Sequence, residues 1–292
     1  MTHINSEGKF NDSSYLIDGM LLGLPNFLAI YIVENNGMRV MFDVGTALKS
    51  RKIVKKLKEF GLYPIHKLVL THSHWDHAQG ATKLQQIQKD NEIEILASKN
   101  AVGNLKDPNK LNEYYEFESY PLEKVTPLKE GDIIDVNGLE LEVINLFGHT
   151  TDSIGIINRK SRNIFVGDAI IDKLDQDAFF VPIMPPEFNE NELLKSFNKL
   201  RTMENELNSI SLGHFGVWTD DDYTQIIKQM ESLYFDVKDS IIQWHSEGYS
   251  IDLITSNYIK KFMPNSKVWD AQVMKVLIEW MLEGLRISKA IK

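Results

Sequence analysis

Apolar and polar residues alternate with the two-residue period of β-strands over the first two thirds of the chain. In residues 27–45, β-branched and aromatic residues flank the turn Asn35-Asn36-Gly37, which predicts a β-hairpin. The same reasoning predicts a second hairpin around Asn137-Gly138 and a third pair of strands around residues 159–161. Shorter apolar runs predict further strands at residues 66–72, 92–98 and 208–213.

Helical spacing appears between these strands and dominates the last quarter of the chain. Residues 47–60 place Leu48, Ile53, Val54 and Leu57 near one helix face, and residues 81–90 suggest another helix. From residue 219 onward no strand pattern remains, and Thr219 can cap a helix whose first turn carries Asp220, Asp221 and Asp222. Residues 100–129 form a polar stretch with several aromatics and show no readable period.

Two strand-rich halves with helices between them predict an α/β fold in which a pair of sheets is covered on both sides. We expect a catalytic domain in residues 1–218 and a helical C-terminal extension in residues 219–292. The apolar stripes of the extension can pack on the sandwich, form a homodimer face or close over a substrate. No Pro- or Gly-rich linker marks the boundary near Trp218.

Composition narrows the choice of function. The chain has 292 residues, of which 43% are hydrophobic and 25% charged, as in soluble globular proteins. The net charge of -9 disfavours a nucleic-acid partner and leaves a small-molecule substrate as the expectation. The absence of cysteine restricts any metal to histidine and carboxylate ligands. Neither a signal peptide nor a membrane span is recognisable, so we expect a cytoplasmic protein.

Histidines and aspartates gather directly after predicted strands. The loop THSHWDHAQG contains His72, His74, Asp76 and His77, and residues two apart in an extended stretch project to the same side. Further along the chain, other such residues each follow a strand and a glycine, which lets the backbone turn tightly at a site. These residues are His149, Asp168 and His214.

The loop THSHWDHAQG resembles the HxHxDH signature of the metallo-β-lactamase superfamily, and FGHTTDS, FVGDAI and LGHFG follow in that family's order. The resemblance covers about residues 20–218 and implies a four-layer αββα sandwich with a dinuclear metal site. It also implies that His72, His74 and His149 bind one metal, that Asp76, His77 and His214 bind the second, and that Asp168 bridges them. Asp43-Val44-Gly45 resembles the family's early aspartate motif.

Imidazole and carboxylate ligands suit zinc, our first choice for the two divalent ions, and also iron or manganese. Two such metals about 3.5–4 Å apart lower the pKa of a shared water from about 15.7 toward about 7. The leading prediction is therefore a hydrolase in which metal-bound hydroxide attacks a thioester, ester or lactone carbonyl. Asp76 or Asp168 would pass a proton to the leaving group. The ligand set is similar to that of glyoxalase II and of lactonases.

Residues 171–187 carry apolar side chains between prolines and acids. We expect part of this segment and two tryptophans to line an apolar substrate pocket beside the metals. The residues expected there are Trp75, Phe179, Phe180, Met184 and Trp218.

Other functions stay open at this point. A phosphodiesterase or ribonuclease occurs on the same fold with the same ligands, although the acidic charge argues against it. An iron-dependent persulfide dioxygenase would use mainly His72, His74 and His149. A flavin-dependent electron-transfer relative and a non-catalytic scaffold with a relict site are weaker alternatives.

Overall fold

The computed structural model describes residues 2–173, 179–220 and 222–292. Two seven-stranded sheets form its centre. The first sheet contains, in spatial order, β1 (Thr2–Ile4), β16 (Val217–Thr219), β15 (Ser209–Ser211), β12 (Asn163–Phe165), β11 (Ile154–Asn158), β10 (Leu139–Asn145) and β9 (Ile133–Val136). The second contains β2 (Gly8–Lys9), β3 (Ser14–Asp18), β4 (Ala29–Asn35), β5 (Met38–Phe42), β6 (Lys67–Leu70), β7 (Glu94–Ser98) and β8 (Thr126–Leu128). A short ribbon pairs β13 (Asp172–Lys173) with β14 (Phe179–Phe180).

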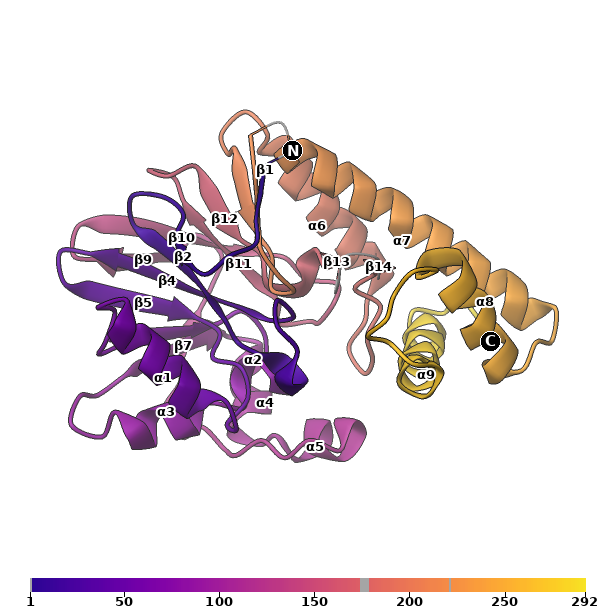
Figure 1. Ribbon diagram of the computed structural model, residues 1–292, viewed down its shortest axis with the longest axis horizontal. Helices are drawn as coiled ribbons and strands as arrows, with labels where there is room; N and C mark the ends of the chain where they lie inside the picture. Colours follow the sequence, from indigo (N-terminus) through magenta and orange to yellow (C-terminus); the bar gives the residue numbers. More distant parts are fainter. Residues whose placement is uncertain (1, 174–178, 221) are drawn as a thin grey trace.

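Helices cover both outer faces of the paired sheets (Figure 1). The second sheet carries α1 (Ser50–Glu59), α3 (Ala81–Ile87) and α4 (Ala101–Lys106), and α5 (Asn109–Tyr115) follows α4. The first sheet carries α6 (Glu190–Thr202) and α7 (Asp222–Ser246), which continues into α8 (Ile251–Phe262) and α9 (Ala271–Ile287). Single turns form at η1 (Leu21–Gly23), α2 (Trp75–Ala78) and η2 (Gly167–Ala169). The four-layer αββα sandwich with a helical extension is therefore confirmed.

The strands have apolar side chains on both faces because both faces are buried. In β5, Met41 points into the core beneath α1, whereas its neighbour Phe42 points into the core between the two sheets. Phe42 stacks there on Phe165 of β12 at a centroid distance of 4.4 Å. The outer face of the first sheet shares one continuous core with α6 and the three C-terminal helices. The extension is thus packed against the sandwich.

Most predicted elements occur at their expected positions. The three predicted strand pairs correspond to β4–β5, β9–β10 and β11–β12, and the predicted helix at residues 47–60 is α1. The pattern gave no indication of β1 to β3, or of α4 and α5 within residues 100–129. These elements are short, and β1 depends on its pairing with β16 at the other end of the chain.

The change from sheet to helix lies close to the predicted position. β16 ends at Thr219 and α7 begins at Asp222, while Asp221 lies outside the described residues. Within the described ranges, we found no helix long and apolar enough to cross a membrane. The division into residues 1–218 and 219–292 stays a prediction.

Candidate metal centre

Seven histidine and aspartate side chains from separate segments of the chain converge between the ends of the two sheets. His72 and His74 follow β6, and Asp76 and His77 lie in the single turn α2. His149 follows β10, Asp168 lies in η2 after β12, and His214 follows β15. Each segment leaves a strand at this edge, and the topology therefore brings residues together that are up to 142 positions apart.

Asp168 lies at the centre of the cluster. Its Oδ2 atom is 3.2 Å from His214 Nε2, 3.6 Å from His149 Nε2 and 4.0 Å from His72 Nε2. Its Oδ1 atom is 3.2 Å from His77 Nε2. One carboxylate thus reaches histidines on both sides of the cluster.

The remaining contacts divide the side chains into groups that can each hold an ion. Within a group, one ligand atom from each residue lies within 4.8 Å of the others. Among the described residues these groups are His72, His74 and His149; His72, His77 and Asp168; and Asp76, His77 and His214. The first and third groups are the two sets that the sequence resemblance implies.

Four of the histidines use Nδ1 for a contact that orients the ring. His77 Nδ1 lies 2.8 Å from Asp43 Oδ2, and His214 Nδ1 lies 2.8 Å from the carbonyl oxygen of Phe27. His149 and His72 make longer contacts through Nδ1, of 3.3 Å and 3.1 Å respectively. Such outer contacts fix the tautomer and aim the other nitrogen at a metal.

In His74 the two ring nitrogens exchange roles, and Nε2 makes the orienting contact. Its Nε2 atom lies 3.1 Å from the hydroxyl of Tyr115, which also donates a hydrogen bond to the carbonyl of Pro185. The Nδ1 atom of His74 therefore faces the cluster, 3.0 Å from His149 Nε2. Tyr115 is the last residue of α5, within the stretch where the sequence showed no period, so sequence analysis missed it.

A glycine permits the close approach of two of these loops. A Cβ atom at Gly213 would lie 2.5 Å from Asp168 Oδ1 and 3.0 Å from the backbone of Gly167. Any larger residue would displace the central carboxylate. The glycine before His214 is therefore explained by the space it leaves.

Burial keeps one half of the cluster neutral. It lowers the pKa of His72 well below its usual value, lowers the pKa of His74 to about 3, and lowers the pKa of His149 against the opposing charge of Asp168. A neutral imidazole keeps one proton, and the contacts of His72 and His149 through Nδ1 and of His74 through Nε2 favour the tautomer in which the other nitrogen is free to bind an ion. Neutral imidazole is the form that binds a metal ion.

Carboxylates dominate the other half. Burial by itself lowers the pKa of His77 and His214, but Asp168 and Asp76 outweigh it, so the pKa of His214 rises to about 10 and that of His77 also rises. Burial opposes ionisation of Asp168, yet His214 and His77 hold its pKa well below the usual value. Buried charges of this kind are either paired or coordinate metals, so a cation bound here would replace the extra protons of His77 and His214 as the partner of these carboxylates.

The cluster fits a bound metal on two further observations. The Nε2 atom of His72 is buried and forms no hydrogen bond within the described part of the chain, although such atoms are nearly always paired. The donor set of imidazole nitrogens and carboxylate oxygens is the one that zinc, iron and manganese accept. A divalent cation would satisfy the unpaired nitrogen and neutralise the carboxylates.

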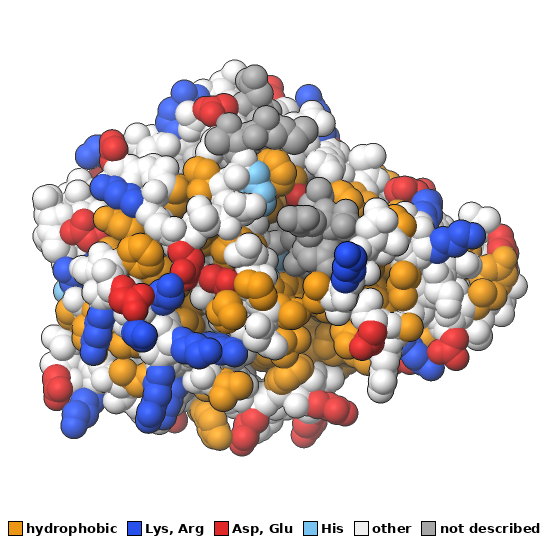
Figure 2. Space-filling model, viewed as in Figure 1, with side chains coloured by type: hydrophobic (Ala, Val, Ile, Leu, Met, Phe, Trp, Pro, Cys, Tyr) orange, Lys and Arg blue, Asp and Glu red, His pale blue; other side chains and the backbone are white. Residues whose placement is uncertain are grey.

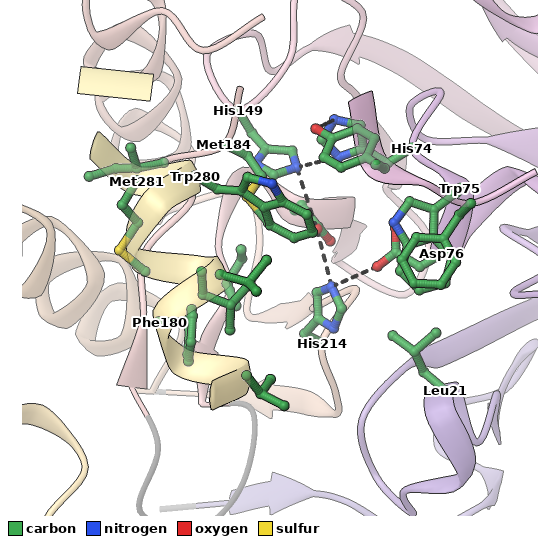
Figure 3. Close-up of a pocket in the computed structure, with 18 of the residues that line it drawn as sticks. Leu21, His74, Trp75, Asp76, His149, Phe180, Met184, His214, Trp280 and Met281 are labelled. Atoms are coloured by element: carbon green, nitrogen blue, oxygen red, sulfur yellow. Dashed lines mark hydrogen bonds and ion pairs between the residues drawn. The ribbon is translucent and has the colours of Figure 1, made fainter. Parts of the chain in front are cut away.

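A pocket of about 630 Å³ opens onto the cluster, and Figure 3 shows His74, Asp76, His149 and His214 along one side of it. Asp168 also reaches this space. The opposite side is apolar and includes Trp280 and Met281 of α9. The volume is in the range of pockets that bind drug-sized molecules.

The predicted pocket residues divide into two sets. Trp75, Phe180 and Met184 line the pocket, whereas Phe179 and Trp218 are not part of its described lining, and their place in a substrate site stays a prediction. Trp218 stacks on His3 at 4.1 Å because β1 pairs with β16, and Phe179 alternates with Phe180 on β14. Residues 174–178 of the predicted segment lie outside the described residues.

Comparison with known proteins agrees with this geometry. Residues 25–214 match the family model of the metallo-beta-lactamase superfamily, and the chain belongs to that superfamily, whose members are mostly hydrolytic enzymes. The hydroxyacylglutathione hydrolase GloC of Haemophilus influenzae is 28% identical over 136 residues. These residues are 42% of this chain and 57% of GloC, so the chain spans little more than half of that relative.

Solved structures share the fold across nearly the whole chain. The metallo-beta-lactamase family protein TTHA1429 from Thermus thermophilus has a TM-score of 0.70 at 16% identity, over 97% of this chain and 96% of that one. A beta-lactamase domain protein from Burkholderia ambifaria has a TM-score of 0.68 at 13% identity, over 98% and 88%. At these identities the likeness concerns the fold alone.

Proposed function

We propose that the chain is a dinuclear metal-dependent hydrolase that cleaves a thioester, ester or lactone carbonyl. The observation that carries the proposal is the pair of three-residue ligand groups on either side of Asp168, beside a pocket. Two groups with a carboxylate between them support two ions, with zinc as the first choice and iron or manganese as alternatives. When bound, two such ions supply a water of lowered pKa and polarise the carbonyl under attack.

The side chains of the cluster would bind the ions, transfer protons or orient the imidazoles. His72, His74 and His149 would hold one ion, Asp76, His77 and His214 the other, and Asp168 would contact both. Asp76 and Asp168 also line the pocket, so their carboxylates lie where a leaving group could receive a proton. The contacts to Asp43, Phe27 and Tyr115 hold the imidazoles at fixed angles.

The nature of the bond cleaved has support from the sequence match. The name of GloC describes hydrolysis of a thioester, which is a carbonyl substrate. A water of lowered pKa would serve as the nucleophile, and the sequence contains no GxSxG motif that would supply a serine in its place. The glutathione part of that substrate is not carried over to this chain.

Metal analysis and substrate screening on one sample test the proposal. Protein purified without added metal should contain close to two transition-metal ions per chain and hydrolyse at least one of the thioesters, esters or lactones in a panel. β-Lactams and bis-p-nitrophenyl phosphate complete the panel. Hydrolysis of the phosphodiester alone, or activity without any metal, would overturn the proposal.

A pair of variants strengthens the experiment. His149→Ala should lose metal and activity together, because it removes a ligand from the first group. His245→Ala removes a histidine near the end of α7, outside every ligand group of the described residues, and should leave both unchanged. Loss of activity in the second variant would point to a general effect on folding.

A further inference from the structure

Exposed apolar side chains concentrate at the mouth of the pocket. Leu22 of η1 is 60% exposed, and Val273 and Val276 of α9 are 41% and 42% exposed, yet all three belong to the pocket lining. Figure 2 shows hydrophobic side chains gathered in the hollow between the sandwich and the C-terminal helices. Apolar residues that remain exposed around one opening indicate a binding surface.

The backbone at Leu22 is strained. Its φ of 52° lies in the left-handed region, which a branched side chain such as leucine rarely adopts. The residue before it, Leu21, is buried in the core and also lines the pocket. This conformation holds Leu22 at the mouth, and strain of this kind is typical of ligand-binding sites.

Helix α9 continues the apolar surface from the mouth to the metal cluster. Leu277, Trp280 and Met281 follow Val273 and Val276 along the helix and line the same pocket. The ring of Trp280 packs edge-on against Tyr115 at 5.2 Å, and Tyr115 in turn contacts His74. An apolar path therefore runs from solvent to the ligands.

The charged side chains of the pocket are acidic. Glu116 at the end of α5 and Glu279 of α9 are exposed lining residues, and Asp76 and Asp168 lie at the cluster. The described part of the lining contains no lysine or arginine. An anionic group at the far end of the substrate would lie near the carboxylates of Glu116 and Glu279, with no lysine or arginine in the described lining to offset them.

We propose that the substrate carries an uncharged apolar acyl chain, which lies along α9 with its carbonyl at the metal cluster and its far end between Leu22 and Val276. This inference rests on the proposed function and names its substrate class. Long, neutral acyl esters or thioesters are favoured, and substrates with a carboxylate on the acyl chain are disfavoured. Glu116 and Glu279 thus determine specificity at the mouth.

A series of p-nitrophenyl esters from acetyl to dodecanoyl tests whether the pocket binds a long acyl chain. The value of kcat/KM should rise with length by up to about fourfold per buried methylene until the chain reaches the mouth. Esters of the same lengths with a terminal carboxylate should have a kcat/KM at least tenfold lower than that of their neutral counterparts. Equal values across lengths, or a preference for the carboxylated esters, would overturn the inference.

Two valines with similar exposure provide a matched comparison. Val276→Asp places a charge in the proposed path, whereas Val268→Asp changes a residue that is 46% exposed and outside the described pocket lining. The first should raise KM for decanoyl esters at least tenfold more than it changes KM for acetyl esters, and the second should leave both KM values unchanged. Glu279→Gln should raise kcat/KM for the carboxylated esters and not for the neutral ones. If the two valine variants behave alike, the path is wrong.

A binding measurement separates this inference from the proposed function. A neutral fluorescent decyl ether contains a ten-carbon alkyl chain but no bond that the enzyme could hydrolyse. It should bind the wild-type protein and lose at least tenfold in affinity with Val276→Asp. Such binding together with inactivity on every carbonyl substrate would reject the proposed hydrolase alone. Hydrolysis of carbonyl substrates without this binding would reject the acyl-chain inference alone.

Discussion

Asp43→Asn isolates the effect of one buried carboxylate that contacts the cluster without belonging to it. Asp43 is 3% exposed, and its Oδ1 accepts a hydrogen bond from the backbone N–H of Thr71 at 2.8 Å. Its Oδ2 accepts from the hydroxyl of Thr71 and from Nδ1 of His77, both at 2.8 Å. Asparagine has the same shape and tolerates the positive φ of 58° at this position.

The substitution reverses the polarity of one atom. If the amide oxygen replaces Oδ1, the NH₂ group faces two donors, the Nδ1–H of His77 and the hydroxyl of Thr71. The ring of His77 then loses the partner that aims Nε2 at the cluster. A lost contact of this kind weakens metal affinity about 10–100-fold, which is about 1.4–2.7 kcal/mol. Each lost charge-assisted hydrogen bond accounts for about 1.5–3 kcal/mol of folding stability.

Metal affinity measured by competition with a chromophoric chelator checks this prediction, together with thermal unfolding with and without metal. Asp135→Asn is the control, because Asp135 is exposed and its Oδ1 only accepts from the N–H of Gly138 in a turn. A folded Asp43→Asn protein with wild-type metal affinity would refute the role that we give to the contact with His77.

Three more predictions follow from the packing around the site. Removal of metal by a chelator should lower Tm by roughly 5–10 °C, since a ligand at a hundred times its Kd adds about 2.7 kcal/mol; an unchanged Tm would contradict a metal that is bound in the folded state. Tyr115→Phe should weaken metal binding about tenfold and shift the visible spectrum of the cobalt-substituted protein, because the hydroxyl holds His74. Gly148→Ala should destabilise by about 3 kcal/mol, as its Cβ would lie 2.3 Å from Leu193 Cα. Gly103→Ala in α4, where a Cβ meets nothing, is the matched control for urea unfolding.

Local sequence patterns determined much of the sandwich. Strands such as β4 and β10 sit in register with their neighbours through turns that Asn and Gly specify within a few residues. The residues of the histidine and aspartate cluster were predictable for the same reason, because each follows a strand and four of them fall within the six residues from His72 to His77. A feature that depends on one or two neighbouring elements can be predicted from the residue pattern of those elements.

The surroundings of the ligands depended on contacts between distant segments. Tyr115 at the end of α5 lies between His74 and Trp280 of α9, and α9 packs on the segment around Ile183, where Gly284 leaves room. Nothing within residues 100–129 or 271–287 indicates these partners. The surroundings of Trp218 also depend on distant residues, because β16 pairs with β1 and Trp218 stacks on His3.

The sequence by itself determined which histidines and aspartates form the candidate metal centre and which strands they follow, because alternation and residue spacing are properties of short stretches. Only the tertiary structure decided what orients those ligands and what forms the opposite side of the pocket. Both depend on the close packing of helices far apart in the chain. The free energy of that packing comes from the burial of apolar surface, and its specificity comes from the fit between two surfaces, which no single segment contains.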